Sequence, residues 1–329
     1  MHIGITYDLR DDYLREGYGH EQTAEFDRVD TIDGIDAALK SLGHGTDRIG
    51  NVRHLVRRLA SGDTWDLVFN IAEGMYGVGR EAQVPALLDA YRIPYTFSDP
   101  LVLALTLHKG LTKTVIRAAG IPTADFAVIE DPADLQSLDL QLPLFAKPVA
   151  EGTGKGISES SRVDTHERLS LLCTKLMHEF RQPVLVETYL PGREFTAGIV
   201  GTDNDAAVIG VMEVLFRNHH EGEKIYSYHS KSNYEELIDY VIPEREVVQA
   251  CSDLALAAWR ALGCRDGGRV DIRMDSLDRP NFIEVNPLAG LNPVHSDLPI
   301  ICRLLGIPFQ DLIARILDSA MQRIGRKES

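Results

Sequence analysis

The chain has 329 residues, enough for two or three compact units, and its content of 44% hydrophobic and 25% charged residues is typical of a globular protein. Its net charge of −15 disfavours binding to nucleic acid, and no run approaches the roughly 18 apolar residues of a membrane span. Because charged residues interrupt the N-terminal sequence MHIGITYDLR where a signal peptide is apolar, we expect a cytoplasmic protein. None of the four cysteines forms a C-x-x-C pair, so we expect buried thiols rather than a zinc site or redox motif.

Strand and helix patterns alternate through the first hundred residues. A buried strand is predicted at Met1–Tyr7, a polar loop over Asp8–Gln22, and a helix from Glu25 that ends at Gly43. The later patterns predict strands near Arg48–Ile49, Trp65–Ile71 and Ile93–Phe97, and helices around His54–Leu59 and Val84–Tyr91. This alternation predicts a parallel sheet, and the Gly-rich loop Glu73–Gln83 follows its third strand, at the edge where such sheets bind ligands.

Two further units are expected after the first one closes near Pro100, which gives boundaries of 1–100, 101–182 and 183–329. The second unit is predicted to hold a helix at Leu107–Ala119, strands at Phe126–Ile129 and Leu144–Pro148, and a helix at His166–Phe180. The third is predicted to hold strands at Val184–Leu190, Ala206–Phe216, Gly268–Met274 and Pro280–Val285. The sequence has no internal repeat.

The segment Gly267–Gly290 carries the most informative motif. Two strand-like runs flank a turn at Ser276–Arg279, with Asp271 on the first run and Glu284 and Asn286 on the second. Residues two apart on a strand face the same side, and a hairpin would bring Asp271 opposite them. Two carboxylates and an amide oxygen form an all-oxygen set that suits Mg²⁺. The alternative is a solvated hairpin with scattered acids, but the apolar neighbours of Glu284 favour a metal site.

A lysine-bearing strand and a Gly-rich loop form the second motif, LFAKPVAEGTGKGIS at Leu144–Ser158. Backbone N–H groups in such a loop can surround phosphate oxygens, and Lys147 adds a positive charge. The G-x-x-x-x-G-K-[ST] spacing of a Walker A loop is absent. Taken alone, the segment is as compatible with a flexible surface loop as with a phosphate site.

The third motif, VLVETYLPGREF at Val184–Phe195, places two carboxylates around a Pro-Gly turn. Glu187 ends a predicted strand and Glu194 follows the turn, so both could hold polar groups of adenine and ribose. Alone this signal is weak, because an exposed glutamate is usually only solvated.

Taken together in their order along the chain, the three motifs resemble the ATP-grasp superfamily, and specifically the D-alanine–D-alanine ligase family. The resemblance covers nearly the whole chain and is most specific from Lys147 to Gly290. It implies an α/β, three-domain ATP-grasp fold with an N-terminal parallel-sheet domain. It also implies an ADP-forming ligase that joins a carboxylate to an amine through an acyl phosphate, with ATP and two Mg²⁺ ions, for which Mn²⁺ could substitute. Small amino acids or carboxylates as substrates, a homodimer and a role in peptidoglycan precursor synthesis follow from the same resemblance.

The resemblance assigns roles to individual residues. For ATP it implies phosphate contacts by Lys109 and Lys147, loop contacts by Glu151, Gly152 and Thr153, adenine contacts by Glu187, Tyr189 and Leu190, a ribose contact by Glu194 and a γ-phosphate contact by Lys231. For Mg²⁺ it implies Asp271, Glu284 and Asn286 as ligands. Arg269 and the backbone N–H of Gly290 would stabilise an oxyanion, and His295 and Ser296 would lie at the substrate carboxylate. The segment Gly222–Asn233, with Lys224 and Lys231, is expected to be a lid that nucleotide orders.

The amino-acid half departs from the family pattern. Glu25 is the best match to the glutamate that holds the first substrate's ammonium, with Glu21 as an alternative and a simple helix-start acid as the other interpretation. Glu73 stands where a histidine is usual, and Arg80 and Glu81 stand where the family tends to have a Gly-Glu-Asp-Gly run. Thr153 replaces a serine and Ser232 replaces a tyrosine, so we expect this pocket to differ from that of a dialanine ligase.

The exchange of histidine for Glu73 adds an anion near the substrate. Unless Arg80 compensates, that anion favours a substrate with an additional positive group. Three functions therefore stay open: dialanine synthesis, a ligase of the same class for a different amino acid pair or small carboxylate, and an ATP-binding regulatory protein without catalysis.

Overall fold

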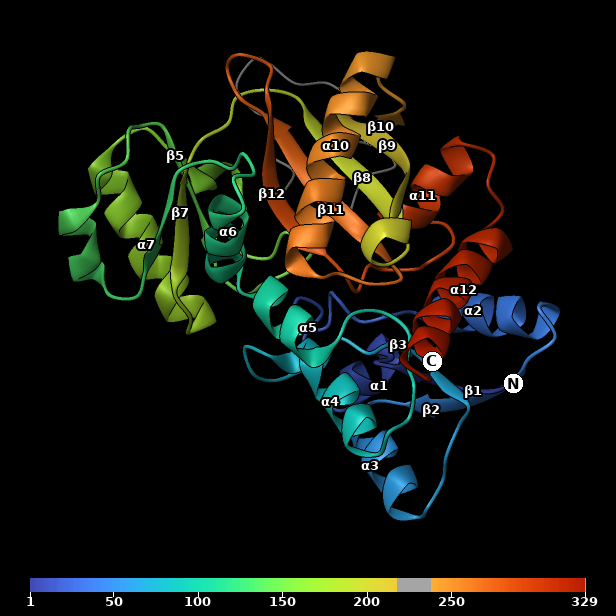
Figure 1. Cartoon of the computed structure of the whole chain (residues 1–329). Coiled ribbons are helices and arrows are strands. Elements are labelled where there is room, and N and C mark those ends of the chain that lie inside the picture. The colour runs from blue at the N-terminus through green and yellow to red at the C-terminus, as the bar shows by residue number, and fades with distance from the viewer. Residues whose placement is uncertain (218–237, 329) are drawn as a thin grey trace.

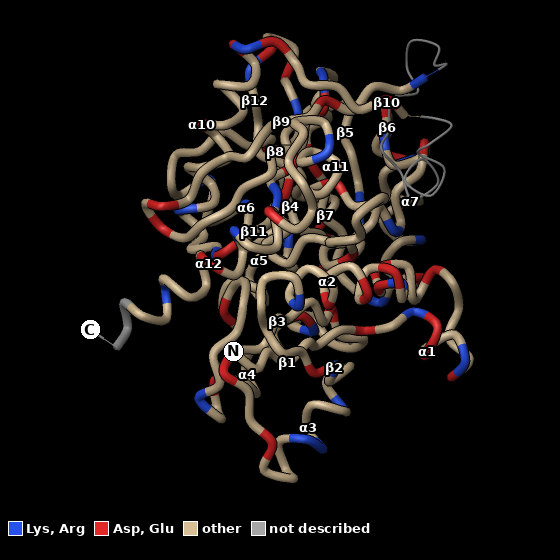
Figure 2. The backbone as a smooth tube through the Cα atoms, turned by 90° about the vertical axis from the view of Figure 1, so that its right-hand side faces the viewer, with Lys and Arg blue, Asp and Glu red and all other residues tan. Residues whose placement is uncertain are grey.

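The computed structural model describes residues 1–217 and 238–328. Three sheets organise the chain (Figure 1): a parallel three-stranded sheet near the N-terminus, then an antiparallel four-stranded and an antiparallel five-stranded sheet. The α/β class and the parallel N-terminal sheet are thus as predicted. Figure 2 shows acidic and basic residues distributed over all three parts. None of the described helices is long and apolar enough to cross a membrane.

The N-terminal sheet has the order β2-β1-β3. Its strands are β1 (His2–Tyr7), β2 (Gly45–Gly50) and β3 (Leu67–Ile71), and its helices include α2 (Val29–Ser41), α3 (Val52–Ala60) and α4 (Gln83–Ala90). Apolar side chains on both faces of the strands are buried, as expected for a parallel sheet covered on both sides. The last helix of the chain, α12 (Phe309–Glu328), returns to pack against α2, and Leu312 and Ile316 share a core with Ile3 and Ile32 (Figure 1).

Three predictions for this first unit are wrong in detail. The predicted loop Asp8–Gln22 contains a short helix, α1 (Arg10–Arg15), and the helix predicted from Glu25 begins only at Val29. The reason is a competing pairing: Asp27 N–H donates to Asp8 O, and Leu9 and Asp27 form a parallel bridge, which holds the preceding residues out of the helix. The predicted strand Ile93–Phe97 contributes a single bridge, from Tyr95 to Val68.

The four-stranded sheet has the order β4-β7-β5-β6. Its strands are β4 (Phe126–Ile129), β5 (Leu144–Pro148), β6 (Arg162–Val163) and β7 (Val184–Thr188), and α7 (His166–Phe180) packs on it. The helix predicted over Leu107–Ala119 is α6 (Lys109–Ala118), and a helix that was not predicted, α5 (Pro100–Leu107), precedes it. They are separated at His108, whose side chain accepts a hydrogen bond from Leu111 N and caps α6.

The five-stranded sheet has the order β10-β9-β8-β11-β12. Its strands are β8 (Glu194–Val200), β9 (Ala207–Phe216), β10 (Ile238–Val241), β11 (Gly267–Met274) and β12 (Pro280–Asn286). The helix α10 (Arg245–Leu262) packs on one face with Trp259 fully buried, and α11 (Asp297–Leu304) contacts β9, β8 and β11. Four short 3₁₀ helices complete the described chain at Arg80–Ala82, Pro132–Ser137, Glu159–Ser161 and Asp203–Asp205.

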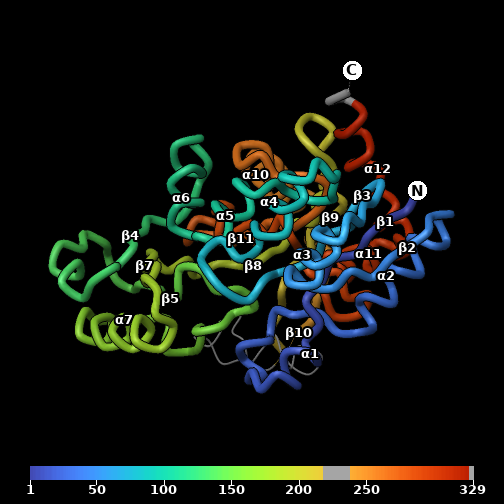
Figure 3. Tube along the Cα trace, turned by 90° about the horizontal axis from the view of Figure 1, so that it is seen from below, coloured from blue at the N-terminus to red at the C-terminus, as the bar shows by residue number. Residues whose placement is uncertain are grey.

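All four cysteines are free and buried, as the sequence predicts. The N-terminal sheet lies below the five-stranded sheet in Figure 1, and the view from below in Figure 3 shows that the four-stranded sheet extends to one side. The boundaries at residues 100 and 182 stay a prediction.

Candidate active site

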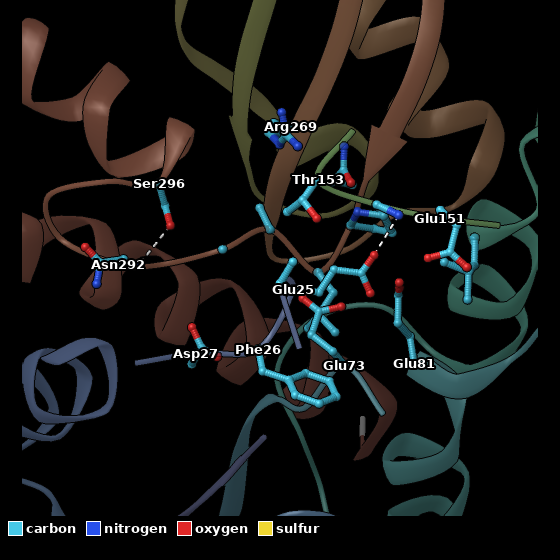
Figure 4. Close-up of a pocket in the computed structure, with 18 of the residues that line it drawn as sticks. Glu25, Phe26, Asp27, Glu73, Glu81, Glu151, Thr153, Arg269, Asn292 and Ser296 are labelled. Atoms are coloured by element: carbon cyan, nitrogen blue, oxygen red, sulfur yellow. Dashed lines mark hydrogen bonds between the residues drawn. The ribbon is translucent and has the colours of Figure 1, made fainter. Parts of the chain in front are cut away.

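A cavity of about 680 Å³ lies between the N-terminal unit, the Gly-rich loop after β5 and the β11–β12 hairpin. It collects side chains from segments that are far apart in the sequence (Figure 4). Those among the sequence-predicted site residues are Glu25, Glu73, Lys109, Glu151, Gly152, Thr153, Arg269, Glu284, Asn286, Gly290, His295 and Ser296. Its volume lies in the range of small-molecule sites.

A second, smaller cavity of about 90 Å³ adjoins it. It is lined by most of the residues assigned above to the nucleotide: Lys147, Glu187, Tyr189, Leu190 and Glu194. Lys109, Glu151 and Glu284 line both cavities, so the two spaces meet at these side chains. The fold thus joins a narrow site on the four-stranded sheet to a wide site over the N-terminal unit.

The β11–β12 hairpin brings the three proposed metal ligands together. Asp271 lies directly opposite Glu284, and Arg269 lies opposite Asn286. The register shifts between Asp271 and Ile272, and such a bulge re-aims side chains at the strand end. The Thr196 hydroxyl donates to Asp271 Oδ1 at 2.9 Å, and Asn286 Nδ2 lies 3.5 Å from Asp271 Oδ2.

These oxygens fit a hard cation. The donor set is two carboxylates and one amide, and each carboxylate oxygen keeps lone pairs beyond those its hydrogen bonds use. Among the described residues, no group of three or more His, Cys, Asp and Glu side chains gathers into a metal site, so any metal here needs the amide oxygen of Asn286 and oxygens from a ligand.

Two cations flank this hairpin. Lys109 Nζ lies 3.5 Å from Glu284 Oε2 and donates to the backbone oxygen of Glu151 at 2.5 Å. The guanidinium of Arg269 contacts both oxygens of Asp271 at 3.0 Å and Asp297 Oδ2 at 2.6 Å. Arg269 is therefore held between two carboxylates, at the wall of the large cavity. A guanidinium fixed in this way can stabilise negative charge that develops in the cavity without first having to reorganise.

Glu187 lies in the small cavity between two buried lysines. Lys113 Nζ is 2.6 Å from its Oε1 and Lys147 Nζ is 3.0 Å from its Oε2. Burial alone would raise the pKa of the Glu187 carboxyl, but the two lysines lower it to about 2. Lys113 was not expected from the sequence, although it follows Lys109 by one helical turn. The carboxylate is thus ionised, with cations already on both oxygens.

The neighbouring residues form a polar edge of the same cavity. Arg273 Nη1 is 3.2 Å from Glu194 Oε2, and Arg273 Nη2 donates to the Tyr189 hydroxyl at 3.2 Å. The Arg162 guanidinium stacks over the Tyr189 ring, 4.9 Å from its centroid. This edge combines a flat ring, a carboxylate and guanidinium groups, as recognition of a polar heterocycle with hydroxyl groups requires.

The Gly-rich loop contacts the N-terminal unit through Glu25. Gly152 N–H donates to Glu25 Oε1 at 2.6 Å, and a Cβ at Gly152 would lie 2.6 Å from the same oxygen, so glycine permits this approach. Arg80 Nη2 lies 2.8 Å from Glu25 Oε2, and Lys155 Nζ lies 3.4 Å from Glu25 Oε1. Glu25 therefore lies at the cavity and already has two cationic partners, whereas Glu21 is exposed outside it.

Three more acids line the same part of the large cavity. Burial, and then the neighbouring Glu81 and Glu25, raise the pKa of Glu73 well above its ordinary value. Burial raises the pKa of Glu81 to about 7, although Arg80 opposes this. Burial and Asp8 raise the pKa of Asp27 to about 8. Within residues 1–217 and 238–328, neither Glu73 nor Glu81 has an ion pair or a side-chain hydrogen bond.

The loop after β12 closes the opposite side. Ser296 Oγ accepts a hydrogen bond from Asn292 N at 2.9 Å, and a Cβ at Gly290 would lie 2.8 Å from that hydroxyl oxygen. The Asn292 side chain, which sequence reasoning missed, donates to Asp30 and Thr31 in the N-terminal unit. It thereby fixes the loop that carries Gly290 and Ser296 against the first unit.

Two assigned residues, Lys231 and Ser232, and the expected lid Gly222–Asn233 lie outside the described residues. The structure adds Asp27, Lys113, Lys155, Arg273 and Asn292 to the two cavities or their supports. Lys155 had a usable signal, because it lies four residues after Glu151 in the Gly-rich loop and pairs with it at 2.9 Å. Arg273 and Asn292 have polar partners that are distant in sequence, which no local pattern reveals.

Comparisons with known proteins agree with this arrangement. The family model described as "D-ala D-ala ligase C-terminus" matches residues 115–318. A D-alanine–D-alanine ligase of Actinobacillus pleuropneumoniae serotype 5b is 32% identical over 291 residues, which cover 86% of this chain and 90% of that one. A protein of Sinorhizobium fredii described as "Uncharacterized protein y4sG" is 30% identical over 301 residues, which cover 88% of this chain and 87% of the other.

The solved structures include a similar fold over the full length. The crystal structure of D-alanine–D-alanine ligase from Bacillus anthracis complexed with ATP aligns with a TM-score of 0.73, covers 100% of both chains and is 21% identical in sequence. Fold and site together define an ATP-grasp ligase. Within that class, this chain belongs to the D-alanine–D-alanine ligase family.

Proposed function

We propose that the chain is an ADP-forming ligase that uses ATP and Mg²⁺ to join a small amino acid or carboxylate to an amine. The observation that carries the proposal is the meeting of the two cavities at Lys109 and Glu284, beside the Asp271–Glu284 pair. A nucleotide in the small cavity would present its terminal phosphate at this junction. A carboxylate in the large cavity would meet it there.

Two bond exchanges make up the proposed reaction. A carboxylate oxygen attacks the γ-phosphorus, the bond to the β-phosphate oxygen breaks, and ADP leaves. The amine then attacks the acyl carbon and loses a proton, and phosphate departs with the carboxylate oxygen. Mg²⁺, when bound, neutralises charge on the transferring phosphoryl group.

The chain's own groups supply the remaining charge stabilisation. Lys109 and Lys147 lie where phosphate oxygens would enter, and neither needs to move far because both are already ion-paired and buried. Arg269, fixed by Asp271 and Asp297, faces the cavity in which the tetrahedral oxyanion would form. No nucleophilic side chain is required.

For the metal we propose Asp271, Glu284 and Asn286 as ligands, with two ions expected and Mn²⁺ as a substitute. Synthesis of D-alanyl-D-alanine for peptidoglycan in the cytoplasm is the reaction that the family suggests first. The large number of acids in the wide cavity favours the alternative, a ligase of the same class for another pair. The homodimer stays a prediction.

Release of ADP and phosphate in the presence of Mg²⁺, ATP and a panel of D- and L-amino acids tests the proposal. We expect release that depends on both Mg²⁺ and an amino acid. A pure protein that binds an ATP analogue but releases no ADP with any member of the panel would contradict it, and would favour an ATP-binding regulatory protein.

A further inference from the structure

Four carboxylates line the lower part of the large cavity in Figure 4, which we call the floor, and Asp27 lies apart from the other three. Glu25 and Asp27 come from the segment before α2, Glu73 follows β3, and Glu81 lies in the short 3₁₀ helix before α4. Figure 4 shows Glu25, Glu73 and Glu81 converging beneath Thr153 and Arg269. Two chain segments that are distant in sequence, the residues before α2 and the loop between β3 and α4, therefore deliver acids to one place, so their meeting is a property of the fold.

The cations near this floor make other contacts: Arg10 donates to the backbone oxygens of Thr23 and Ala24, and Arg28 pairs with Asp30. Arg80 donates to Glu25 and to the backbone oxygen of Ala150 at 2.9 Å. Lys155 is shared between Glu25 and Glu151. Arg80 therefore balances the charge of Glu25. Glu73 and Glu81 have no ion pair within the described part of the chain.

A separate observation points to an occupant of the same space. The Thr153 hydroxyl oxygen is buried and has no hydrogen-bond partner among the described residues, although buried hydroxyls nearly always have one. Thr153 lines the cavity and is held in a left-handed backbone conformation, with φ +49°. This hydroxyl and the acids without ion pairs line a space of about 680 Å³, which is the size of a small-molecule site.

The chemistry of that ligand follows from the charge. A carboxylate that loses water on burial is stabilised again by a cation, by hydrogen-bond donors or by protonation, and a cation gives the strongest of these contacts to the ionised form. Burial raises the pKa of both Glu73 and Glu81, which favours their protonated forms in these surroundings. A ligand ammonium or guanidinium would restore the ionised forms, whereas an apolar side chain would bury them further.

We propose that the amino acid bound on this floor is a basic one, whose side-chain ammonium or guanidinium takes Glu73 and Glu81 as partners. This inference rests on the proposed ligase function and names the class of its first substrate. The substrate's carboxyl group lies toward Lys109 and Glu284, where the phosphate arrives, and its side chain extends toward the floor. An alanine would reach the junction but leave both acids without a counter-ion.

Pairs of amino acids that differ by one charge test this directly. Lysine is compared with norleucine and ornithine with norvaline, each as D and L forms, in the ADP-release assay. We expect kcat/KM for the basic member of the preferred chirality to exceed that for its neutral partner by about 10- to 100-fold, as for a hydrogen bond to a charged group. Calorimetric binding of the same pairs in the presence of an ATP analogue should show the same order.

Two variants assign the effect to the floor. Glu73→Gln and Glu81→Gln should each reduce the preference for the basic member by about tenfold while leaving the KM for ATP unchanged. Glu179→Gln, at an exposed position on α7, is the matched control and should change neither. The comparison of lysine with norleucine in the unaltered protein needs no variant, so it stands even if a substitution disturbs folding.

The outcomes separate the two proposals. Absence of ADP release with every amino acid overturns the ligase function itself. ADP release that is fastest with a neutral amino acid, and unchanged in preference by Glu73→Gln and Glu81→Gln, overturns the basic substrate while the ligase function stands.

Discussion

Two buried glutamates at the site have carboxyl pKa values that their surroundings shift in opposite directions. Glu187, in the small cavity, lies between Lys113 and Lys147 and its pKa falls to about 2. Glu73, in the large cavity, has neighbouring acids instead, and its pKa rises well above the ordinary value. The first acid has its counter-ions within the chain, whereas the second has no ion pair among the described residues. On the proposed assignment, the nucleotide half of the site is preorganised, and the amino-acid half holds its specificity in acids that a ligand would pair with.

The largest effect is expected where the two halves meet. Glu284→Gln should lower kcat by at least about 10²- to 10³-fold, because it removes the negative charge from one proposed metal ligand. The melting temperature should be nearly unchanged, since Glu284 lies at the cavity wall rather than in the core. Turnover titrated with Mg²⁺ gives the answer, and full activity with an unaltered Mg²⁺ dependence would remove Glu284 from the metal site.

On the nucleotide side, breaking the lysine pair should cost stability. Lys113→Met leaves the buried Glu187 with one cation and should lower the free energy of unfolding by about 3 to 5 kcal/mol. Lys175→Met, at an exposed position on α7, is the control and should change it little. Denaturant unfolding measures both, and equal values for the two variants would contradict the role given to Lys113.

On the amino-acid side, Arg80→Met should weaken substrate binding more than nucleotide binding. Without Arg80, Glu25 and the backbone oxygen of Ala150 lose the guanidinium that holds them in place, so the acids of the floor are no longer fixed. We expect the KM for the amino acid to rise by about tenfold while the KM for ATP stays constant. If the KM for ATP changed by the same factor, Arg80 would act on both nucleotide and amino-acid binding, which would contradict this prediction.

The smallest effect concerns pH. Folding raises the pKa of Glu81 to about 7 from an ordinary 4.5, so the folded chain keeps a proton that the unfolded chain releases. Without an added amino acid, the contribution of Glu81 to the free energy of unfolding should therefore be greatest below about pH 4.5 and should fall as the pH rises to about 7. Glu81→Gln removes this loss and should raise the melting temperature at pH 8 by about 2 to 4 °C, with little change at pH 4. A basic amino acid should produce a similar rise in the unaltered protein, and a melting temperature unchanged by Glu81→Gln at pH 8 would contradict the assignment.

The sequence predicted the elements with strong local patterns. The hairpin holding Asp271 and Glu284, the lysine strand β5 and the helix α7 form as expected, because alternation and periodicity are properties of a few adjacent residues. The true start of α2 was missed because the pairing of Asp27 with Asp8 overrides the helical pattern. Nor could the sequence show that Arg80 pairs with Glu25, 55 positions away, rather than with Glu73.

The same contrast explains the site. Residues of the nucleotide half lie in contiguous motifs, so their resemblance to a family was readable before any fold was known. The floor of the large cavity is assembled by tertiary packing from two segments that are distant in sequence. The charge of this floor depends on which cation pairs with which acid. Such pairs join residues that are distant in sequence, so local sequence patterns do not predict them.

One measurement tests the central contrast most directly: initial rates of ADP release by the unaltered protein, with Mg²⁺ and ATP varied against lysine, norleucine and alanine in both chiralities. The account predicts one common KM for ATP across the panel and a kcat/KM for a lysine enantiomer about tenfold or more above those for norleucine and alanine. If D-alanine alone saturates the enzyme with the highest kcat/KM, the plain dialanine reaction holds and the special role of Glu73 and Glu81 is contradicted.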